Sequence, residues 1–164
     1  MNVIWRNCWI AGCLFFCSSF CLADEQRWYF VRHFEKLPGE NPGLTVKGQQ
    51  RAQSLARYFT HIPVTKIYST DYQRTRQSAQ PLAEQLGMDI EYYSPARLAD
   101  FASTLGSTDR IVVVGHSNTT PELVRLMGGE AKVMDEKDFG RLYILSKNDL
   151  GTHTQSVIMS FGQP

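Results

Sequence analysis

Four consecutive β-branched residues, Ile111-Val112-Val113-Val114, place the strongest constraint on how this chain can fold. Neighbouring side chains of a strand point to opposite faces, so an apolar run without alternation predicts a strand that is buried on both faces. Trp28-Tyr29-Phe30-Val31 is a second run of this kind. Strands buried on both faces need helices on both sides of a mostly parallel sheet.

Helical patterns alternate with these strands along the chain. Thr45 is a plausible cap for a helix that ends before Pro63, and we expect Pro81 to kink or split the next helix. The chain closes with two strands joined by a turn, which predicts an antiparallel hairpin. The predicted fold is a three-layer α/β/α sandwich with a mostly parallel sheet and a C-terminal antiparallel hairpin. The expected elements are strands at 28–31, 64–69, 89–93, 110–115, 142–145 and 152–161, and helices at 45–62, 72–86, 95–105 and 120–127.

The first 23 residues have the layout of a secretory signal peptide, with Arg6, an apolar run over residues 8–22, and Ala23 at the end. The run is shorter than the ~20 apolar residues that a membrane span needs. We therefore expect residues 1–23 to be a signal peptide and residues 24–164 to be one exported domain, periplasmic or secreted. A retained amino-terminal anchor is the alternative.

Cysteine and charge restrict the exported part further. All 4 cysteines lie within the first 23 residues, so the predicted domain has no disulfide, thiol chemistry or thiolate metal site. Without Arg6, basic and acidic residues are equal in number. A neutral chain does not favour nucleic acid as a partner, and any affinity for anions must come from a local arrangement of side chains.

Polar residues follow both buried strands at the point where each ends. Arg32-His33 comes after the first strand and His116 after the run that ends at Gly115. Arg74 lies in the first turn of the helix after the strand at 64–69. The carboxyl ends of parallel strands share one edge of the sheet, so we expect these four side chains to converge there.

Two arginines and two histidines at one edge predict a pocket for a dianion, and phosphoryl is the obvious group. Phosphoryl transfer needs positioning, positive charge around the equatorial oxygens, and a nucleophile in line with the leaving oxygen. Flanking guanidinium charge disfavours imidazolium, so one histidine should stay neutral and able to attack phosphorus. The second histidine would donate a hydrogen bond to the phosphoryl oxygens.

Four separated segments together resemble the histidine phosphatase superfamily, with its phosphoglycerate-mutase-like fold, and most of all its small exported members of branch 1. The segments occur in the order and spacing of that family. They are Arg32-His33 after a strand, Leu44-Thr45 with Gly48, Ser69 to Arg74 with Ala79, and Val114 to Thr119.

The resemblance implies that His33 is a nucleophile that forms a phosphohistidine, which water then hydrolyses. It also implies that no metal or other cofactor takes part. The phosphate pocket and substrate-binding residues that it implies are Arg32, Arg74, His116, Ser117 and Asn118. Ser117 stands where the acid-phosphatase and phytase branch has an aspartate as proton donor.

The general acid is open between two carboxylates. Asp100 falls near the place where mutase-like members carry theirs, and Glu35 lies two residues after the expected nucleophile. Each also has a structural interpretation. Asp100 would be a surface charge on an amphipathic helix, and Glu35 would orient Arg32 or a loop amide.

These observations predict an exported, metal-independent phosphomonoester hydrolase that acts through phosphohistidine. The alternative is a binding or regulatory protein of the same fold that is catalytically impaired. A mutase is disfavoured by the chain's length and by export. The expected partner is a small phosphorylated substrate or a phosphorylated envelope component, and membrane contact is expected only through an uncleaved signal segment.

Overall fold

The computed structural model describes residues 26–106, 110–148 and 151–159. The predicted signal peptide and its cysteines lie outside these residues. Within them no helix has the length and apolar character that crossing a membrane requires. In chain order the elements are β1 (Gln26–Arg32), α1 (Val46–Tyr58), β2 (Lys66–Ser69), α2 (Gln73–Leu86), β3 (Ile90–Tyr92), α3 (Leu98–Thr104), β4 (Arg110–Gly115), α4 (Thr119–Leu126), β5 (Arg141–Asn148) and β6 (Gly151–Ile158).

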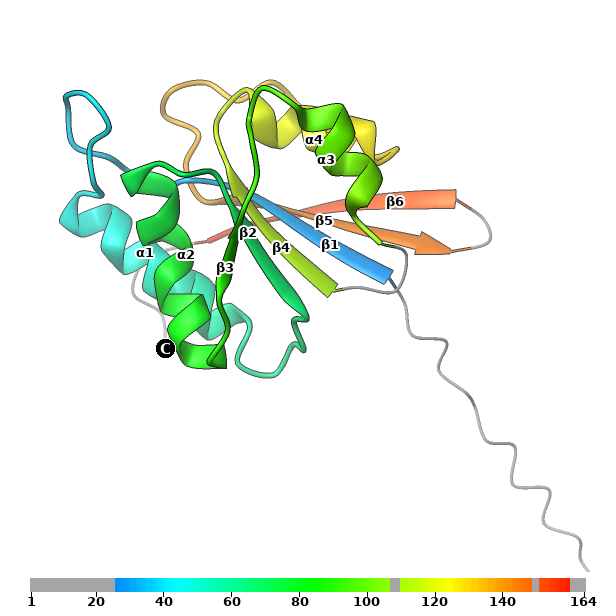
Figure 1. Cartoon of the computed structure of the whole chain (residues 1–164), viewed down its shortest axis with the longest axis horizontal. Helices are drawn as coiled ribbons and strands as arrows, with labels where there is room; N and C mark the ends of the chain where they lie inside the picture. Colours follow the sequence, from blue (N-terminus) through cyan, green and yellow to red (C-terminus); the bar gives the residue numbers. More distant parts are fainter. Residues whose placement is uncertain (1–25, 107–109, 149–150, 160–164) are drawn as a thin grey trace, which may run out of the picture.

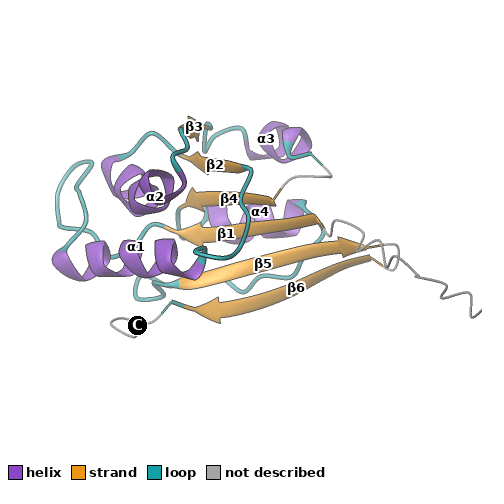
Figure 2. Ribbon diagram, turned by 90° about the horizontal axis from the view of Figure 1, so that it is seen from below, coloured by secondary structure: helices purple, strands orange, loops and turns teal. Residues whose placement is uncertain are grey.

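The strands form one sheet in the order β3-β2-β4-β1-β5-β6. The first four of these neighbours are parallel, whereas β5 runs antiparallel to both β1 and β6. Helices α1 and α2 cover one face of the sheet, and α3 and α4 cover the other (Figures 1 and 2). The predicted three-layer sandwich with a C-terminal antiparallel hairpin is confirmed.

Two hydrophobic cores fill the spaces between these layers. Tyr29 and Val31 of β1 pack with α1 and α2, whereas Trp28 and Phe30 pack with α3 and α4. The residues of β4 divide between the two cores in the same way. Because both faces of β1 and β4 are covered, the polar residues that follow these strands begin at a buried sheet edge.

The predicted start of α1 is confirmed. The Thr45 side chain accepts a hydrogen bond from the Gly48 backbone N–H at 3.1 Å, which caps the first turn. Ala52, Leu55 and Ala56 are buried against α2 and the sheet. This packing places the start of α1 directly beside the segment that follows β1.

Two helices differ from expectation. Helix α2 continues through Pro81 without a break, so the expected split is wrong. Helix α4 begins at Thr119, one residue before the expected range of 120–127, and the Thr120 N–H bonds to the carbonyl of His116 at 2.9 Å. Pro121 is then the third residue of the helix, where a missing N–H removes no intrahelical bond.

We predict that Gly48→Ala destabilises the protein. A Cβ at this position would overlap the Glu35 backbone carbonyl oxygen, which the cap at Thr45 holds in place. Alanine favours a helix by ~1 kcal/mol over glycine, but overpacking costs ~1–3 kcal/mol and a backbone oxygen cannot rotate away. Because the oxygen is fixed, the cost lies at the upper end of that range, and urea unfolding should show a net loss of about 2 kcal/mol.

Gln53→Ala is the matched control, because Gln53 is exposed on the same helix. Its free energy of unfolding should stay within ~0.5 kcal/mol of the parent. Equal or greater stability of the Gly48→Ala protein would contradict the packing described for this helix start.

Candidate active site

The pairing of β1 with β4 brings the two predicted histidines together. Arg32 is in register with Gly115, so His33 and His116 each follow directly after a paired residue. The His33 backbone N–H donates to the Gly115 carbonyl at 2.9 Å, and the centroids of the two imidazole rings lie 5.6 Å apart.

Arg74 reaches the same edge from the first turn of α2. Its Nη2 lies 3.4 Å from His116 Nδ1, and its guanidinium stacks over the Tyr72 ring at 4.5 Å from the centroid. The structure thus brings together all four residues that the sequence pointed to. They line one cavity of about 510 Å³. Its lining residues are Arg32, His33, Lys36, Tyr72, Arg74, Pro95, Ala96, His116, Ser117, Asn118, Thr119 and Glu136.

His33 is held as a neutral imidazole with one nitrogen left to react. Its Nδ1 lies 2.8 Å from the Phe34 carbonyl oxygen, which can only accept, so Nδ1 carries the hydrogen and Nε2 carries the lone pair. Burial lowers the pKa of His33 to about 3, and the charge of Arg32 adds to that effect. The ring is therefore uncharged at neutral pH, and its Nε2 keeps a lone pair.

His116 is oriented by a chain of hydroxyl groups. Thr75 Oγ1 donates to the Thr70 carbonyl at 2.8 Å, and Thr70 Oγ1 donates to Thr75 Oγ1 at 3.0 Å. Thr70 Oγ1 therefore accepts from His116 Nε2 at 2.9 Å, which leaves His116 Nδ1 as the acceptor that faces Arg74. Burial, followed by the charge of Arg74, lowers the pKa of His116 to about 4.

Arg32 and Arg74 each have a buried N–H donor that no described residue accepts from. Arg32 Nη1 donates to the Asp135 carbonyl at 2.6 Å, and its guanidinium lies 4.2 Å from the centroid of the Phe139 ring. The Nε atoms of Arg32 and Arg74 are buried and have no hydrogen-bond partner among the described residues. Buried donors of this kind are costly unless an acceptor reaches them, and phosphoryl oxygens are well suited to do so.

Glu35 lies in the loop that follows β1 and pairs with residues of α1. Its carboxylate accepts from Arg51 at 2.8 and 3.1 Å and lies 3.5 Å from Lys47 Nζ. It does not line the cavity. Burial raises the pKa of Glu35, but the hydrogen bonds and charge of Arg51, followed by the charge of Lys47, outweigh burial and hold that pKa below its usual value. The structure thus gives Glu35 a structural contact, with Arg51 as its partner.

Asp100 also lies away from the cavity. It is in the first turn of α3, its side chain is 68% exposed, and it pairs with Arg97 at 3.0 Å. The inward side chain of this turn is Phe101, which stacks on Tyr93 at 4.2 Å between ring centroids. Neither carboxylate that the sequence offered as a general acid is placed among the cavity's lining residues.

Glu136 lines the cavity and was missed by the sequence analysis. It lies in the segment between α4 and β5, more than 100 residues from Arg32 in the chain. The run Asp135 to Asp138 has neither helical nor strand periodicity. No pattern in the sequence connects this run with the strand ends, and the contacts of Arg32 with Asp135 and Phe139 reveal the connection.

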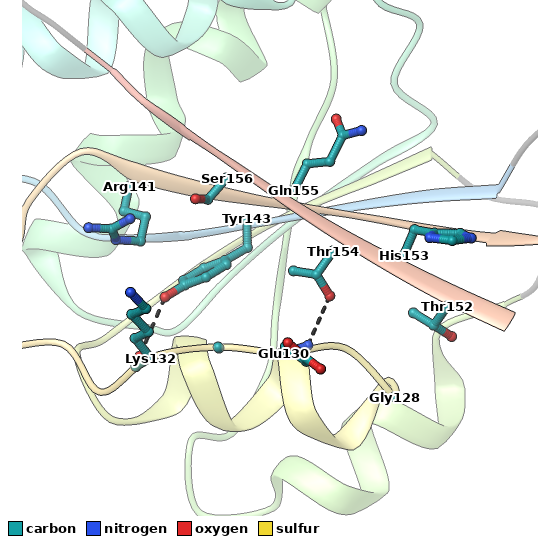
Figure 3. Close-up of a pocket in the computed structure, with 11 residues that line it drawn as sticks. Gly128, Glu130, Lys132, Arg141, Tyr143, Thr152, His153, Thr154, Gln155 and Ser156 are labelled. Carbon is teal, nitrogen blue, oxygen red and sulfur yellow. Dashed lines mark hydrogen bonds between the residues drawn. The ribbon is translucent and has the colours of Figure 1, made fainter.

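A second cavity, of about 590 Å³, lies on the β5–β6 hairpin (Figure 3). It is a polar groove between the hairpin and the segment after α4, where Thr154 Oγ1 accepts from the Glu130 N–H at 2.8 Å. It shares no lining residue with the histidine cavity. Within the described residues, no group of three or more His, Cys, Asp or Glu side chains is placed to hold a metal ion.

Residues 29–103 match the family described as "Histidine phosphatase superfamily (branch 1)". A protein of Escherichia coli O1:K1 named "Probable phosphoglycerate mutase GpmB" is 35% identical over 77 residues, which cover 42% of this chain and 36% of that protein. The chain thus spans about a third of the length of the curated relatives that it matches.

Solved structures share the fold at low sequence identity. The alpha-ribazole phosphatase from Shigella flexneri superposes with a TM-score of 0.65 at 15% identity, covering 85% of this chain and all of the other. The protein histidine phosphatase SixA complexed with tungstate superposes with a TM-score of 0.62 at 12% identity, covering 80% of this chain and 94% of the other.

We predict that Glu35→Gln destabilises the protein in a pH-dependent way. A carboxylate with a depressed pKa stabilises the folded state above its unfolded pKa of ~4.3 and loses that contribution as pH falls through the folded value. Urea unfolding should show a loss of about 1–3 kcal/mol at pH 7 that shrinks below about pH 4.

Asp100→Asn provides the control, because it removes an exposed carboxylate that also pairs with an arginine. Its effect should stay within ~0.5 kcal/mol at every pH tested. A Glu35→Gln protein as stable as the parent at pH 7, or equally destabilised at pH 7 and pH 3, would contradict the assignment.

Proposed function

Because residues 29–103 match the histidine phosphatase superfamily (branch 1) and the described chain has a phosphoglycerate-mutase-like fold, we propose that the protein hydrolyses phosphate monoesters through a phosphohistidine at His33. One observation carries the proposal. The unprotonated Nε2 of a buried, neutral His33 shares a cavity with two guanidinium groups whose buried Nε donors lack partners among the described residues.

The reaction has two steps in this proposal. His33 Nε2 attacks phosphorus, so a P–N bond forms while the bond to the leaving oxygen breaks. Water then attacks the phosphohistidine, which releases inorganic phosphate and restores the imidazole. Arg32 and Arg74 stabilise the negative charge of the equatorial oxygens in both steps.

His116 assists by binding the phosphoryl group. Its Nε2–H is held by Thr70, so only Nδ1 faces the cavity. A bound dianion favours proton uptake at Nδ1, which converts this nitrogen from an acceptor into a donor to a phosphoryl oxygen. Ser117 and Asn118, which line the same cavity, are the proposed contacts to the rest of the substrate.

The proposal also covers metal independence and export. We propose that no metal takes part, because the two guanidinium groups already supply the positive charge that phosphoryl transfer needs. We also propose export, supported by Arg6 and the apolar run that follows it. An exported phosphatase would act on a small phosphorylated compound or on a phosphorylated component of the cell envelope.

A second candidate function is a binding or regulatory protein that has lost turnover. The observation that favours it is the position of Glu35 and Asp100, both of which pair with arginines away from the cavity. Such a protein would bind phosphate esters and release them unchanged.

We predict that the purified protein hydrolyses p-nitrophenyl phosphate in the presence of EDTA and that His33→Ala lowers kcat/KM by ~10³-fold or more. This substrate has an activated leaving group, so it reports on the nucleophile with little need for an acid. His61→Ala serves as the control, because His61 lies beyond the end of α1 and does not line the cavity.

Different results would refute the nucleophile, the metal-free reaction and the hydrolytic activity. Substantial activity in the His33→Ala protein would refute the nucleophile. Loss of activity in EDTA that a divalent cation restores would refute the metal-free reaction. Phosphate-ester binding by calorimetry without turnover would favour the binding protein over the hydrolase.

A further inference from the structure

A tight turn at residues 135–138 is built directly on Arg32. The Asp135 carbonyl accepts from Arg32 Nη1 at 2.6 Å, and the Asp135 carboxylate accepts from the Lys137 N–H at 2.7 Å. The Phe139 ring that follows lies under the Arg32 guanidinium, and Asp138 lies 3.5 Å from Arg141 at the start of β5. These contacts fix the turn relative to the two histidines.

Glu136 occupies this turn and faces the cavity. It is the one acidic residue among those that line it. Within the described part of the chain, its carboxylate makes no hydrogen bond or ion pair. Burial lowers the pKa of Arg32, and the charges of Asp138 and then Glu136 act against that effect, so the Glu136 carboxyl group lies close to the Arg32 guanidinium. A carboxyl group that is carried by a turn held at its neighbours Asp135 and Lys137, and that has no partner of its own in the part of the chain that the structure describes, is suited to transfer a proton.

We propose that Glu136 is the general acid of this site and that the substrate is therefore a phosphate ester of an alcohol. This inference rests on the proposed function. As His33 Nε2 forms its bond to phosphorus and the P–O bond breaks, the carboxylic acid of Glu136 gives its proton to the departing oxygen, which leaves as an alcohol. The resulting carboxylate then takes a proton from the water that attacks the phosphohistidine, so Glu136 is regenerated.

The substrate class follows from the leaving group. An alkoxide is strongly basic and departs slowly without a proton, whereas a nitrophenolate departs readily without one. A positioned acid contributes ~10²–10⁴-fold in rate where proton transfer is needed and little where it is not. A carboxyl group placed at the cavity therefore speeds the hydrolysis of alcohol esters much more than that of nitrophenyl esters.

The test compares three esters with leaving groups of increasing basicity: p-nitrophenyl, phenyl and benzyl phosphate. Benzyl phosphate is an alcohol ester of nearly the same shape as phenyl phosphate. Glu136→Gln should lower kcat/KM by less than ~3-fold on p-nitrophenyl phosphate and by ~10²–10³-fold on benzyl phosphate, with phenyl phosphate between them. Glu136→Asp should recover part of the loss on benzyl phosphate.

Glu130→Gln is the matched control, because Glu130 lies in the same segment but lines the other groove. It should leave all three rates unchanged. A parent protein that hydrolyses none of the esters would overturn the proposed function. A parent protein that hydrolyses only the phenolic esters would overturn the inference about substrate class. An equal change on all three esters in the Glu136→Gln protein, or no change, would overturn the role of Glu136 and leave the hydrolase standing.

Discussion

The site depends on the parallel pairing of β1 with β4. This pairing places Arg32 opposite Gly115 and bonds the His33 N–H to the Gly115 carbonyl, so both histidines emerge at one buried edge. Only glycine fits at position 115, because a Cβ there would lie 2.8 Å from the hydroxyl oxygens of Thr119 and Tyr93. Burial at this edge, between helices on both faces of the sheet, holds the pKa of both imidazoles below its ordinary value and keeps them neutral at pH 7.

The arginines near this edge have two different roles: some hold loops in place, and some direct N–H donors into the cavity. Arg32 holds the turn at Asp135 with one nitrogen and keeps Nε for the cavity. Arg51 plays the purely structural part, since it joins Glu35 after β1 to the Met159 carbonyl at the end of the hairpin. The loop after His33 is therefore held by Arg51, and the turn that carries Glu136 is held by Arg32. This division allows the cavity to keep its own arginine donors for a ligand.

Much of this arrangement could be predicted from the sequence, because the rules that apply are local. Apolar runs identified the central strands, and the geometry of a parallel sheet placed Arg32, His33 and His116 at one edge. The segments that could not be predicted depend on distant contacts. The turn with Glu136 is defined by a bond to Arg32 103 residues away. The outward position of Asp100 depends on the short α3 turning Phe101 inward.

The central claim is that the imidazole of His33 takes the phosphoryl group, and trapping that species tests it most directly. The protein would be mixed with p-nitrophenyl phosphate, quenched in alkaline detergent that preserves P–N bonds, and mapped by tandem mass spectrometry. We predict one phosphoryl group on His33, which is absent from the His33→Asn protein. Turnover accompanied by a phosphoryl group on His116 or on a carboxylate would contradict the account.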